Sequence, residues 1–194
     1  MKHYLIGVIA AMMITGTAMA QHNNFGIKGG LNAYNVYSDD NSSADTKMGY
    51  HFGLISHIHL GNQFAIQPEL IYSTQGSQYT IGSTTAKLNL NYVNVPLLFQ
   101  YMFDNGFRLM AGPQLGFLVS AKTEIDNTKT DVKDNLKKME VAFGIGASYV
   151  HPPSGFGVDA RYNFGLTNIN DVGSVNSYNR GLQVGVFYLF KHGS

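Results

Sequence analysis

Cysteine and tryptophan are both absent from the 194-residue sequence. Without cysteine the chain cannot form disulfide bonds, and it cannot carry the lipid-modified cysteine that anchors a lipoprotein. Charge is also sparse and balanced, with 13 Lys and Arg against 12 Asp and Glu. A neutral chain lacks the basic surface that a nucleic-acid-binding protein needs. We therefore expect no nucleic acid partner, and a stability that owes nothing to disulfides.

Long hydrophobic runs are missing as well, except at the amino terminus. Residues 1–20 have a basic start at Lys2, an apolar run over 5–13, and the small-residue sequence Ala18-Met19-Ala20. This pattern predicts a cleaved secretory signal peptide, because the apolar run is too short for a membrane-spanning helix. The remaining residues, 21–194, are predicted to form one domain, since their number is typical of a single domain.

Eight segments alternate apolar residues with polar residues or glycine, and this period of two is the pattern of a β-strand. Strands of soluble proteins usually run about 5–6 residues, whereas a tilted strand that crosses a membrane needs about 9–11. Every segment reaches the longer length, which favours membrane-spanning strands. The segments cover residues 25–37, 47–60, 64–79, 86–103, 107–124, 139–150, 156–167 and 178–190.

The connections between these segments alternate between short and long. Tight turns are predicted at residues 61–63, 104–106 and 151–155, where Gly, Asn and Pro gather. An outer-membrane barrel has this asymmetry, with short turns in the periplasm and long loops outside the cell. The longer polar loops are expected at residues 38–46, 80–85, 125–138 and 168–177.

Each segment has one apolar face and one face of polar residues or glycine. In 107–124, for example, Leu109 and Leu115 share one face, whereas Arg108 and Gln114 share the other. Glycine gathers on the polar faces, as a narrow barrel requires where side chains crowd its interior. The pattern predicts an all-β fold, an eight-stranded antiparallel up-and-down transmembrane β-barrel with its polar faces inside.

Aromatic residues lie near the segment ends on the short-turn side. A girdle of aromatics at the membrane surface is a feature of outer-membrane barrels. A soluble lipocalin-like barrel in the periplasm is the structural alternative, with its apolar faces inside, because the period alone does not say which face is buried. The predicted girdle comprises Phe25, Phe64, Tyr101, Phe103, Phe107, Tyr149, Phe156, Tyr188 and Phe190.

Two kinds of irregularity interrupt the alternation. Leu88 and Leu90 are out of phase with the apolar residues that follow them in segment 86–103, which predicts a β-bulge at residues 91–93. Proline removes a donor from a strand ladder and is often found at bulges. We therefore expect further local bulges at the three prolines inside the segments, Pro68, Pro96 and Pro113.

Four stretches of the sequence carry a family resemblance. Residues 91–101 (NYVNVPLLFQY), 111–122 (AGPQLGFLVSAK) and 159–170 (DARYNFGLTNIN) resemble, in this order, the PorT-like, porin-family outer-membrane β-barrel domain. Residues 25–32 (FGIKGGLN) resemble the opening strand of that family. The resemblance implies location in the outer membrane, contact with its lipid, and insertion by the barrel-assembly machinery. It implies no activity, because "porin" is largely a label in this family.

The chain departs from the family pattern at two places. The family often has an acidic residue where this chain has Asn94, a position that the alternation places inside the barrel. A lumenal charge network built on that acid is therefore not expected here. A terminal aromatic is usual for recognition by the assembly machinery, and in this chain Phe190 is followed by residues 191–194.

Charged residues occur on the predicted inner faces. An eight-stranded barrel is just wide enough inside for its side chains, so opposite charges are expected to pair as a plug instead of lining a channel. Contact with a solute is the alternative role. The alternation places inside Lys28, Lys47, Glu69, Lys87, Arg108, Lys122, Glu140, Asp159 and Arg161. The lumen charge network is predicted to comprise Lys28, Glu69, Arg108, Glu140, Asp159 and Arg161.

The histidines and serines of the sequence do not form a recognisable metal site or catalytic site. His51, His57 and His59 share one strand face, but a metal site needs a third ligand and supporting contacts that the sequence does not show. Ser56 neighbours His57, yet the two side chains point to opposite faces, which is poor geometry for a nucleophile and its base. The sequence also lacks a nucleophile elbow, a phosphate loop and a zinc-protease motif. We expect no metal, no cofactor and no catalysis.

These observations predict an integral outer-membrane β-barrel with a structural, surface-interaction or binding role. An extracellular ligand, if there is one, is expected at the long loops 38–46 and 125–138, because loops carry function more often than strands. Two other functions stay open. A passive small-solute pore would need an open lumen, and a lipid-modifying enzyme would need a catalytic Ser or His.

Overall fold

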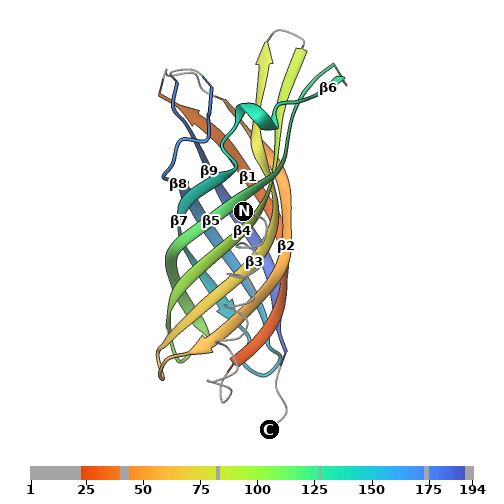
Figure 1. The fold of residues 1–194 in the computed structure, drawn as a ribbon. Coiled ribbons are helices and arrows are strands. Elements are labelled where there is room, and N and C mark those ends of the chain that lie inside the picture. The colour runs from red at the N-terminus through yellow and green to blue at the C-terminus, as the bar shows by residue number, and fades with distance from the viewer. Residues whose placement is uncertain (1–22, 40–43, 82–83, 127, 173–174, 191–194) are drawn as a thin grey trace.

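The computed structural model describes residues 23–39, 44–81, 84–126, 128–172 and 175–190. Eight long antiparallel strands form a closed, tilted barrel (Figure 1). Their bounds lie within two residues of the eight predicted segments, and the predicted fold class is confirmed. The strands are β1 (Asn23–Ser38), β2 (Asp45–His59), β3 (Phe64–Ile81), β4 (Thr84–Met102), β5 (Phe107–Ile125), β7 (Met139–Val150), β8 (Phe156–Gly165) and β9 (Ser177–Leu189).

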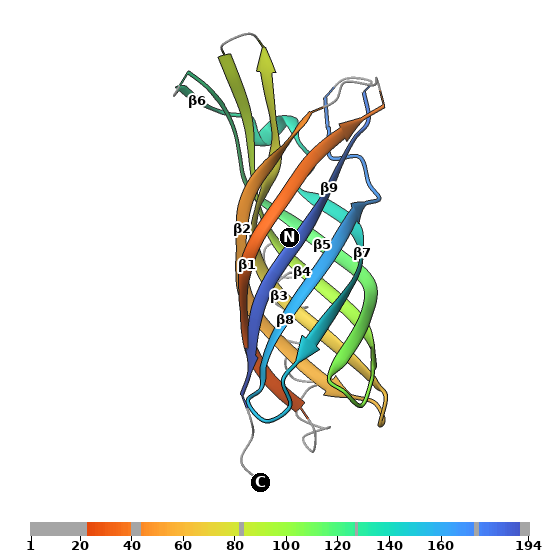
Figure 2. The same ribbon diagram turned by 180° about the vertical axis from the view of Figure 1, so that it is seen from behind.

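Each strand pairs with its neighbours in the chain, and β9 pairs with β1 to close the ring. The view from behind shows β8, β9 and β1 side by side at this closure (Figure 2). Closure leaves no long unpaired strand edge facing lipid, which a barrel in a bilayer requires. The predicted signal peptide, residues 1–20, lies outside the described residues.

The loop predicted at residues 125–138 has structure of its own. It contains a short strand, β6 (Thr128–Asp131), which extends β5 as a hairpin, and a 3-10 turn, η2 (Lys133–Asn135). The β3–β4 hairpin rises beyond the other strands at the end opposite the short turns, and β6 projects to one side next to it (Figure 1). No helix within the described ranges is long and apolar enough to cross a membrane.

The apolar faces of the strands point outward. On β8 the alternation is complete, with Phe156, Val158 and Phe164 exposed and with Asp159 and Arg161 buried. A wall of exposed apolar side chains suits lipid, whereas a soluble barrel would hide this face. The lipocalin-like alternative, with its apolar faces inside, is therefore wrong.

Aromatic side chains encircle the short-turn end of the barrel, as the sequence predicts. Phe64 contacts Tyr101, and Tyr101 contacts Phe103, with ring centroids 5.4 and 4.9 Å apart. On the other side of the ring, Phe156 and Tyr188 pack at 5.0 Å. Aromatic rings of this kind anchor a barrel at the membrane surface.

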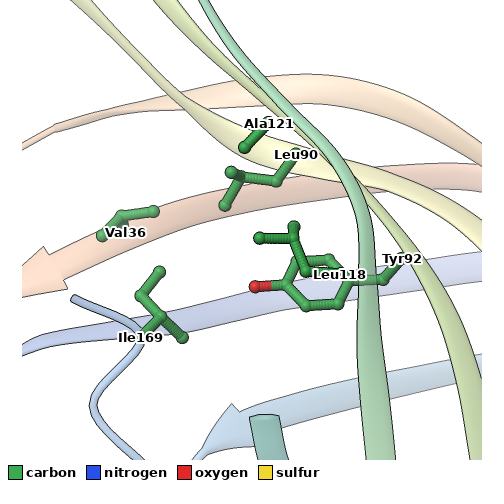
Figure 3. Close-up of a cluster of buried hydrophobic side chains, with 6 residues drawn as sticks. All are labelled: Val36, Leu90, Tyr92, Leu118, Ala121 and Ile169. Carbon is green, nitrogen blue, oxygen red and sulfur yellow. The ribbon is translucent and has the colours of Figure 1, made fainter. Parts of the chain in front are cut away.

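The apolar core lies inside the barrel, near its two ends. At the short-turn end Ile55, Val150, Phe187 and Leu189 pack together. At the loop end a second group, the cap cluster, brings together residues of β1, β4 and β5 and one residue of the loop after β8 (Figure 3). Val132 and Leu136, from the loop between β6 and β7, pack against it. The cap cluster consists of Val36, Leu90, Tyr92, Leu118, Ala121 and Ile169.

A bulge is present at the level of residues 91–93, as predicted, but the extra residue is in β5 and not in β4. Asn91 pairs with Ser120 and Tyr92 pairs with Leu118, so Val119 of β5 is the extra residue. β4 keeps a single phase, because Leu90 and its neighbour Leu88 point inward to the cap cluster. The sequence alone made these leucines look like lipid-facing residues in the wrong phase.

The bulges expected at the prolines are absent. Pro68 pairs with Leu97, Pro96 with Gln114 and Pro113 with Phe143, all in unbroken register. Each proline removes one ladder donor, but the pairs on either side hold the register. A second irregularity lies instead in β2, between Thr46 and His51.

Candidate functional site in the barrel lumen

The centre of the lumen holds four charged side chains that the sequence predicts to point inward. Lys28 comes from β1, Glu69 from β3, and Asp159 and Arg161 from β8. Asp159 and Arg161 are two residues apart, so a β-strand places both on the same face. All four residues are buried, with Arg161 only 1% exposed. Two positive and two negative charges therefore meet in a space closed to bulk water.

Ion pairs join these four side chains. An Arg161 guanidinium nitrogen lies 3.0 Å from a Glu69 carboxylate oxygen, and Lys28 Nζ lies 3.8 Å from the other Glu69 oxygen. Lys28 also forms an ion pair with Asp159. Strands β3 and β8 are four steps apart in either direction around the ring of eight. The Arg161–Glu69 pair therefore joins opposite walls of the barrel.

Amide side chains surround the ion pairs and satisfy some of their remaining donors and acceptors, whereas Asp159 Oδ1 and Arg161 Nε are buried without a hydrogen-bond partner among the described residues. Gln183 accepts hydrogen bonds from Arg161 at 2.9 Å and from Asn163 at 3.0 Å. Gln67 donates to Glu69 at 2.8 Å. A buried ion pair is tolerated only when such contacts offset the loss of water. The central charges and amides thus form one connected network, which we call the central polar layer.

Glycine on the inner faces makes room for these large side chains. A Cβ atom on Gly181 would lie 2.3 Å from the ring of Tyr34, whose hydroxyl accepts a hydrogen bond from Asn163. A Cβ atom on Gly146 would lie 2.8 Å from the Arg161 backbone. Neither distance is possible for a real side chain, so the Tyr34 ring and the Arg161 backbone occupy space that glycine leaves free.

The other two members of the predicted charge network lie elsewhere in the lumen. Arg108 is the second residue of β5, at the short-turn end, and its guanidinium is 3.4 Å from His57 Nδ1. Glu140 is the second residue of β7, at the loop end, and it accepts a hydrogen bond from Asn179 at 3.4 Å. The six predicted residues therefore form three groups along the barrel axis.

Three further lysines predicted to point inward are not in the lumen. Lys47, Lys87 and Lys122 line a cleft on the outer wall, above the lipid-facing residues. The extra residue Val119 reverses the phase of β5, which turns Lys122 outward. The irregularity in β2 beyond Lys47 breaks the alternation there in a similar way.

The uncharged amides of the central polar layer were missed by sequence reasoning, which considered charges alone. Gln67 and Asn163 lie in phase with the buried charges of their own strands, and Gln183 lies in phase with the other buried residues of β9. Their phase is the signal that would have identified them. Asn94, where the family often has an acid, is also buried and inward, as predicted.

His51 and His57 are buried and serve as hydrogen-bonding residues of the lumen. His51 Nδ1 lies 2.7 Å from the side-chain oxygen of Asn32, and the rings of His57 and His59 meet edge to face at 4.5 Å. Within the described residues, no group of three or more potential ligands is placed to hold a metal ion. His57 is buried in the lumen whereas Ser56 lies on the outward face, so these two side chains do not meet.

A family model described as "Outer membrane protein beta-barrel domain" matches residues 19–171. The chain belongs to this family. Its outward apolar faces, aromatic girdle and closed ring are what an outer-membrane β-barrel domain needs to sit in lipid. The protein is therefore an integral outer-membrane barrel in contact with membrane lipid, which confirms the predicted location.

Solved structures with similar folds include two surface proteins. Neisserial surface protein A matches with a TM-score of 0.59 and 16% identity, and the match covers 88% of this chain and 100% of that one. The attachment invasion locus protein Ail of Yersinia pestis matches with a TM-score of 0.56, 16% identity and the same coverage. At this identity the likeness supports the barrel fold alone. No curated protein sequence matches the chain significantly.

Proposed function

We propose that this outer-membrane β-barrel protein has a closed lumen and acts through its external surface, in a structural, surface-interaction or binding role. The observation that carries the proposal is the Arg161–Glu69 ion pair, which joins opposite walls of the barrel. A solute would have to break this pair and separate buried charges, which costs several kcal/mol per ion. A passive pore is therefore the less favoured function.

The cap cluster supports the same proposal at the loop end of the barrel. Ile169 enters this cluster from the loop after β8, and the backbone N–H of Lys137 donates to its carbonyl at 2.8 Å. Leu136 pairs with Asn170 in an isolated bridge between the two loops. The loops thus cover the barrel mouth with apolar side chains, so a polar solute meets a second barrier before the central polar layer.

Planar-bilayer recording tests the closed lumen. The refolded wild-type protein should show no reproducible conductance steps. A Glu69→Ala/Arg161→Ala double variant removes the bridge and should conduct more than a Lys137→Ala/Lys138→Ala control, which removes two exposed charges. Reproducible steps in the wild type, altered by Asp159→Asn, would show instead that the lumen is a solute path.

Two long loops are the proposed contact surface outside the cell. Residues 125–138 expose charges of both signs, including Lys129 and Asp134, and residues 38–46 contribute Asp39 and Asp45. Ail has been crystallised with the heparin analogue sucrose octasulfate. This makes a sulfated sugar the first ligand to test. Binding of sucrose octasulfate should fall when residues 126–137 are replaced by a Gly-Ser turn, while heat-modifiable gel mobility shows that the barrel is still folded.

Further parts of the proposal concern class and biogenesis. We assign the chain to the PorT-like members of the family on residues 91–101, 111–122 and 159–170, and we propose that it is not an enzyme. The separation of Ser56 from His57 supports the second point. We further propose that the chain is cleaved after residue 20, that residues 21–194 form the barrel, and that the barrel-assembly machinery inserts it.

Lipid analysis tests the proposal that the protein is not an enzyme. Overexpression should leave membrane lipid masses unchanged, whereas a new lipid species that is lost in a His57→Ala variant would contradict the non-enzyme assignment.

A further inference from the structure

A cleft of about 620 Å³ lies on the outer wall of the barrel, at the loop end of β2, β3, β4 and β5. This is the corner where the β3–β4 hairpin rises above the other strands and β6 projects to one side (Figure 1). Its lining is polar and strongly biased in charge. Four lysines and one carboxylate contribute, namely Lys47, Lys87, Lys122, Lys129 and Glu124.

The strand register shows that the cleft faces outward. Lys87 pairs with Glu124 and Asn89 pairs with Lys122, so these four side chains share one face of the β4–β5 pair. Leu90, which alternates with them, points into the barrel and belongs to the cap cluster. The cleft therefore lies on the face opposite the lumen and communicates with the membrane surroundings.

Two irregularities assemble the lysines at this place. Val119 is the extra residue of β5, and without it Lys122 would point into the lumen. The register of β2 against β3 also shifts just beyond Lys47. Bulges re-aim side chains and are frequent next to functional sites. Together, the two irregularities place Lys47 and Lys122 in the same cleft on the outer wall.

Most of this charge lacks a counter-ion within the described residues. Glu124 lies 3.8 Å from Lys129. Lys47 donates to the carbonyl of Gln75 at 3.2 Å, and Lys87 and Lys122 form no ion pair with a described carboxylate. Asp131 is opposite Lys122 in register, but its side chain accepts a hydrogen bond from the Lys133 backbone at 2.9 Å. The lining of the cleft thus carries an excess of positive charge, with four lysines against one carboxylate.

The lower edge of the cleft belongs to the lipid-facing wall. Met48 and Tyr50 line this edge and are 64% and 52% exposed, on the same face as Phe52 and Leu54 further down β2. Hydrogen-bonding side chains such as Asn91 and Ser120 also line the cleft. A ligand here would meet apolar side chains below and ammonium groups above.

We propose that this cleft binds the phosphorylated headgroup of an outer-leaflet lipid, whose acyl chains extend along Tyr50 and Phe52. Charge complementarity selects an anionic group, because lysine binds phosphate as a compact point charge. The position at the upper edge of the apolar wall selects a lipid over a soluble anion. The proposal concerns the outer wall and does not depend on whether the lumen is closed.

Native mass spectrometry of the protein released from neutral detergent tests the proposal, with bisphosphorylated lipid A as the probe. We expect one lipid A molecule to be retained. Because each lysine near an anionic lipid surface contributes about 1 kcal/mol, a Lys87→Gln/Lys122→Gln variant should bind roughly 30-fold more weakly. The Lys137→Gln/Lys138→Gln control removes the same charge from two positions before β7 that do not line the cleft, and it should stay within about twofold of the wild type.

Three results would overturn the proposal. The first is an equal loss of affinity in the test and control variants, which would indicate general attraction to a basic surface. The second is equal retention of a phosphate-free, otherwise identical lipid. The third is full displacement of lipid A by inorganic phosphate or sucrose octasulfate at matched concentration, which would assign the cleft to a soluble anion.

A measurement on the unaltered protein keeps the test valid if the double variant does not fold. Lipid A should protect Lys47, Lys87 and Lys122 from acetylation in the wild-type barrel, while Lys137 and Lys138 remain reactive. Protection should weaken as salt is raised, because salt screens these charges. Equal acetylation with and without lipid A would contradict the proposal.

Discussion

Arg161 on β8 and Glu69 on β3 are joined across the full width of the barrel, with nitrogen and oxygen 3.0 Å apart. The two side chains are 1% and 0% exposed. Burying such a pair is costly, and its net contribution to stability is often small. Its role here is therefore geometric, because the pair links the two opposite walls of the barrel at one level.

Glu69→Gln should destabilise the barrel, since it removes one of two negative charges and leaves Lys28 and Arg161 with Asp159 alone. Breaking one partner of a buried ion pair typically costs about 3–5 kcal/mol. Urea unfolding of the protein in phosphatidylcholine vesicles, followed by gel mobility without boiling, measures the change. A Glu69→Gln/Arg161→Gln double variant restores charge balance and should lose less than the sum of the two single variants. Additive losses would show that the pair is not coupled.

Most of the barrel could be predicted from the sequence, because the alternation of lipid-facing and inward residues is local information. Segment 139–150 coincides with β7, and 156–167 overruns β8 by two residues. Short-turn glycines mark the ends well, as at Gly106 and Gly155, which both have positive φ. Strand existence and length follow from the period of two and the bilayer thickness.

The predictions that are wrong, namely the strand that carries the bulge and the direction of Lys122, depend on the register between strands. This register is not local information. The phase change at Leu88 and Leu90 predicts a bulge in β4, whereas the extra residue is Val119 of β5. A single bulge reverses the direction of every side chain beyond it, so Lys122 was placed in the lumen by mistake. The partners of the inward charges likewise depend on strand order around the ring, so the opposition of Arg161 and Glu69 could not be read from either strand alone.

Gly181→Ala should destabilise the barrel by about 1–3 kcal/mol, which is typical of overpacking a filled core. The new methyl group would lie 2.3 Å from the ring of Tyr34. Gly29→Ala is the matched control, because a Cβ atom there meets nothing closer than 3.6 Å. The same urea titration compares them. Equal unfolding free energies for the two variants would contradict the steric account.

Arginine on the lipid-facing wall should be costly in proportion to its depth. Ile145 lies in the middle of β7 and is 53% exposed, so Ile145→Arg should cost about 2–4 kcal/mol. Met139 begins the same strand and is similarly exposed, and Met139→Arg should cost only about 0–1 kcal/mol. Folding yield and urea midpoint in vesicles measure the difference. A larger loss for Met139→Arg would show that the membrane is centred elsewhere on the barrel.

Ile169→Ala should loosen the loops without opening the lumen. Ile169 is 1% exposed in the cap cluster, and its backbone also accepts the Lys137 N–H and donates to Ser177. Loss of its side chain leaves a cavity at the point where two loops meet, so they should open more often. Limited proteolysis from outside vesicles should then cut within residues 132–138 or 166–176 faster than in the wild type. Val172→Ala, in the same loop but 60% exposed, is the control and should change little.

The bilayer recording of the same Ile169→Ala variant separates the two barriers in the lumen. If the central polar layer blocks the barrel, the variant should remain silent, because the Arg161–Glu69 pair lies below the cap cluster and keeps its contacts. If the variant conducts while Val172→Ala does not, the cap cluster is the barrier and the ion pair alone is insufficient. Combining Ile169→Ala with Glu69→Ala/Arg161→Ala removes both barriers, and this triple variant should show the largest conductance.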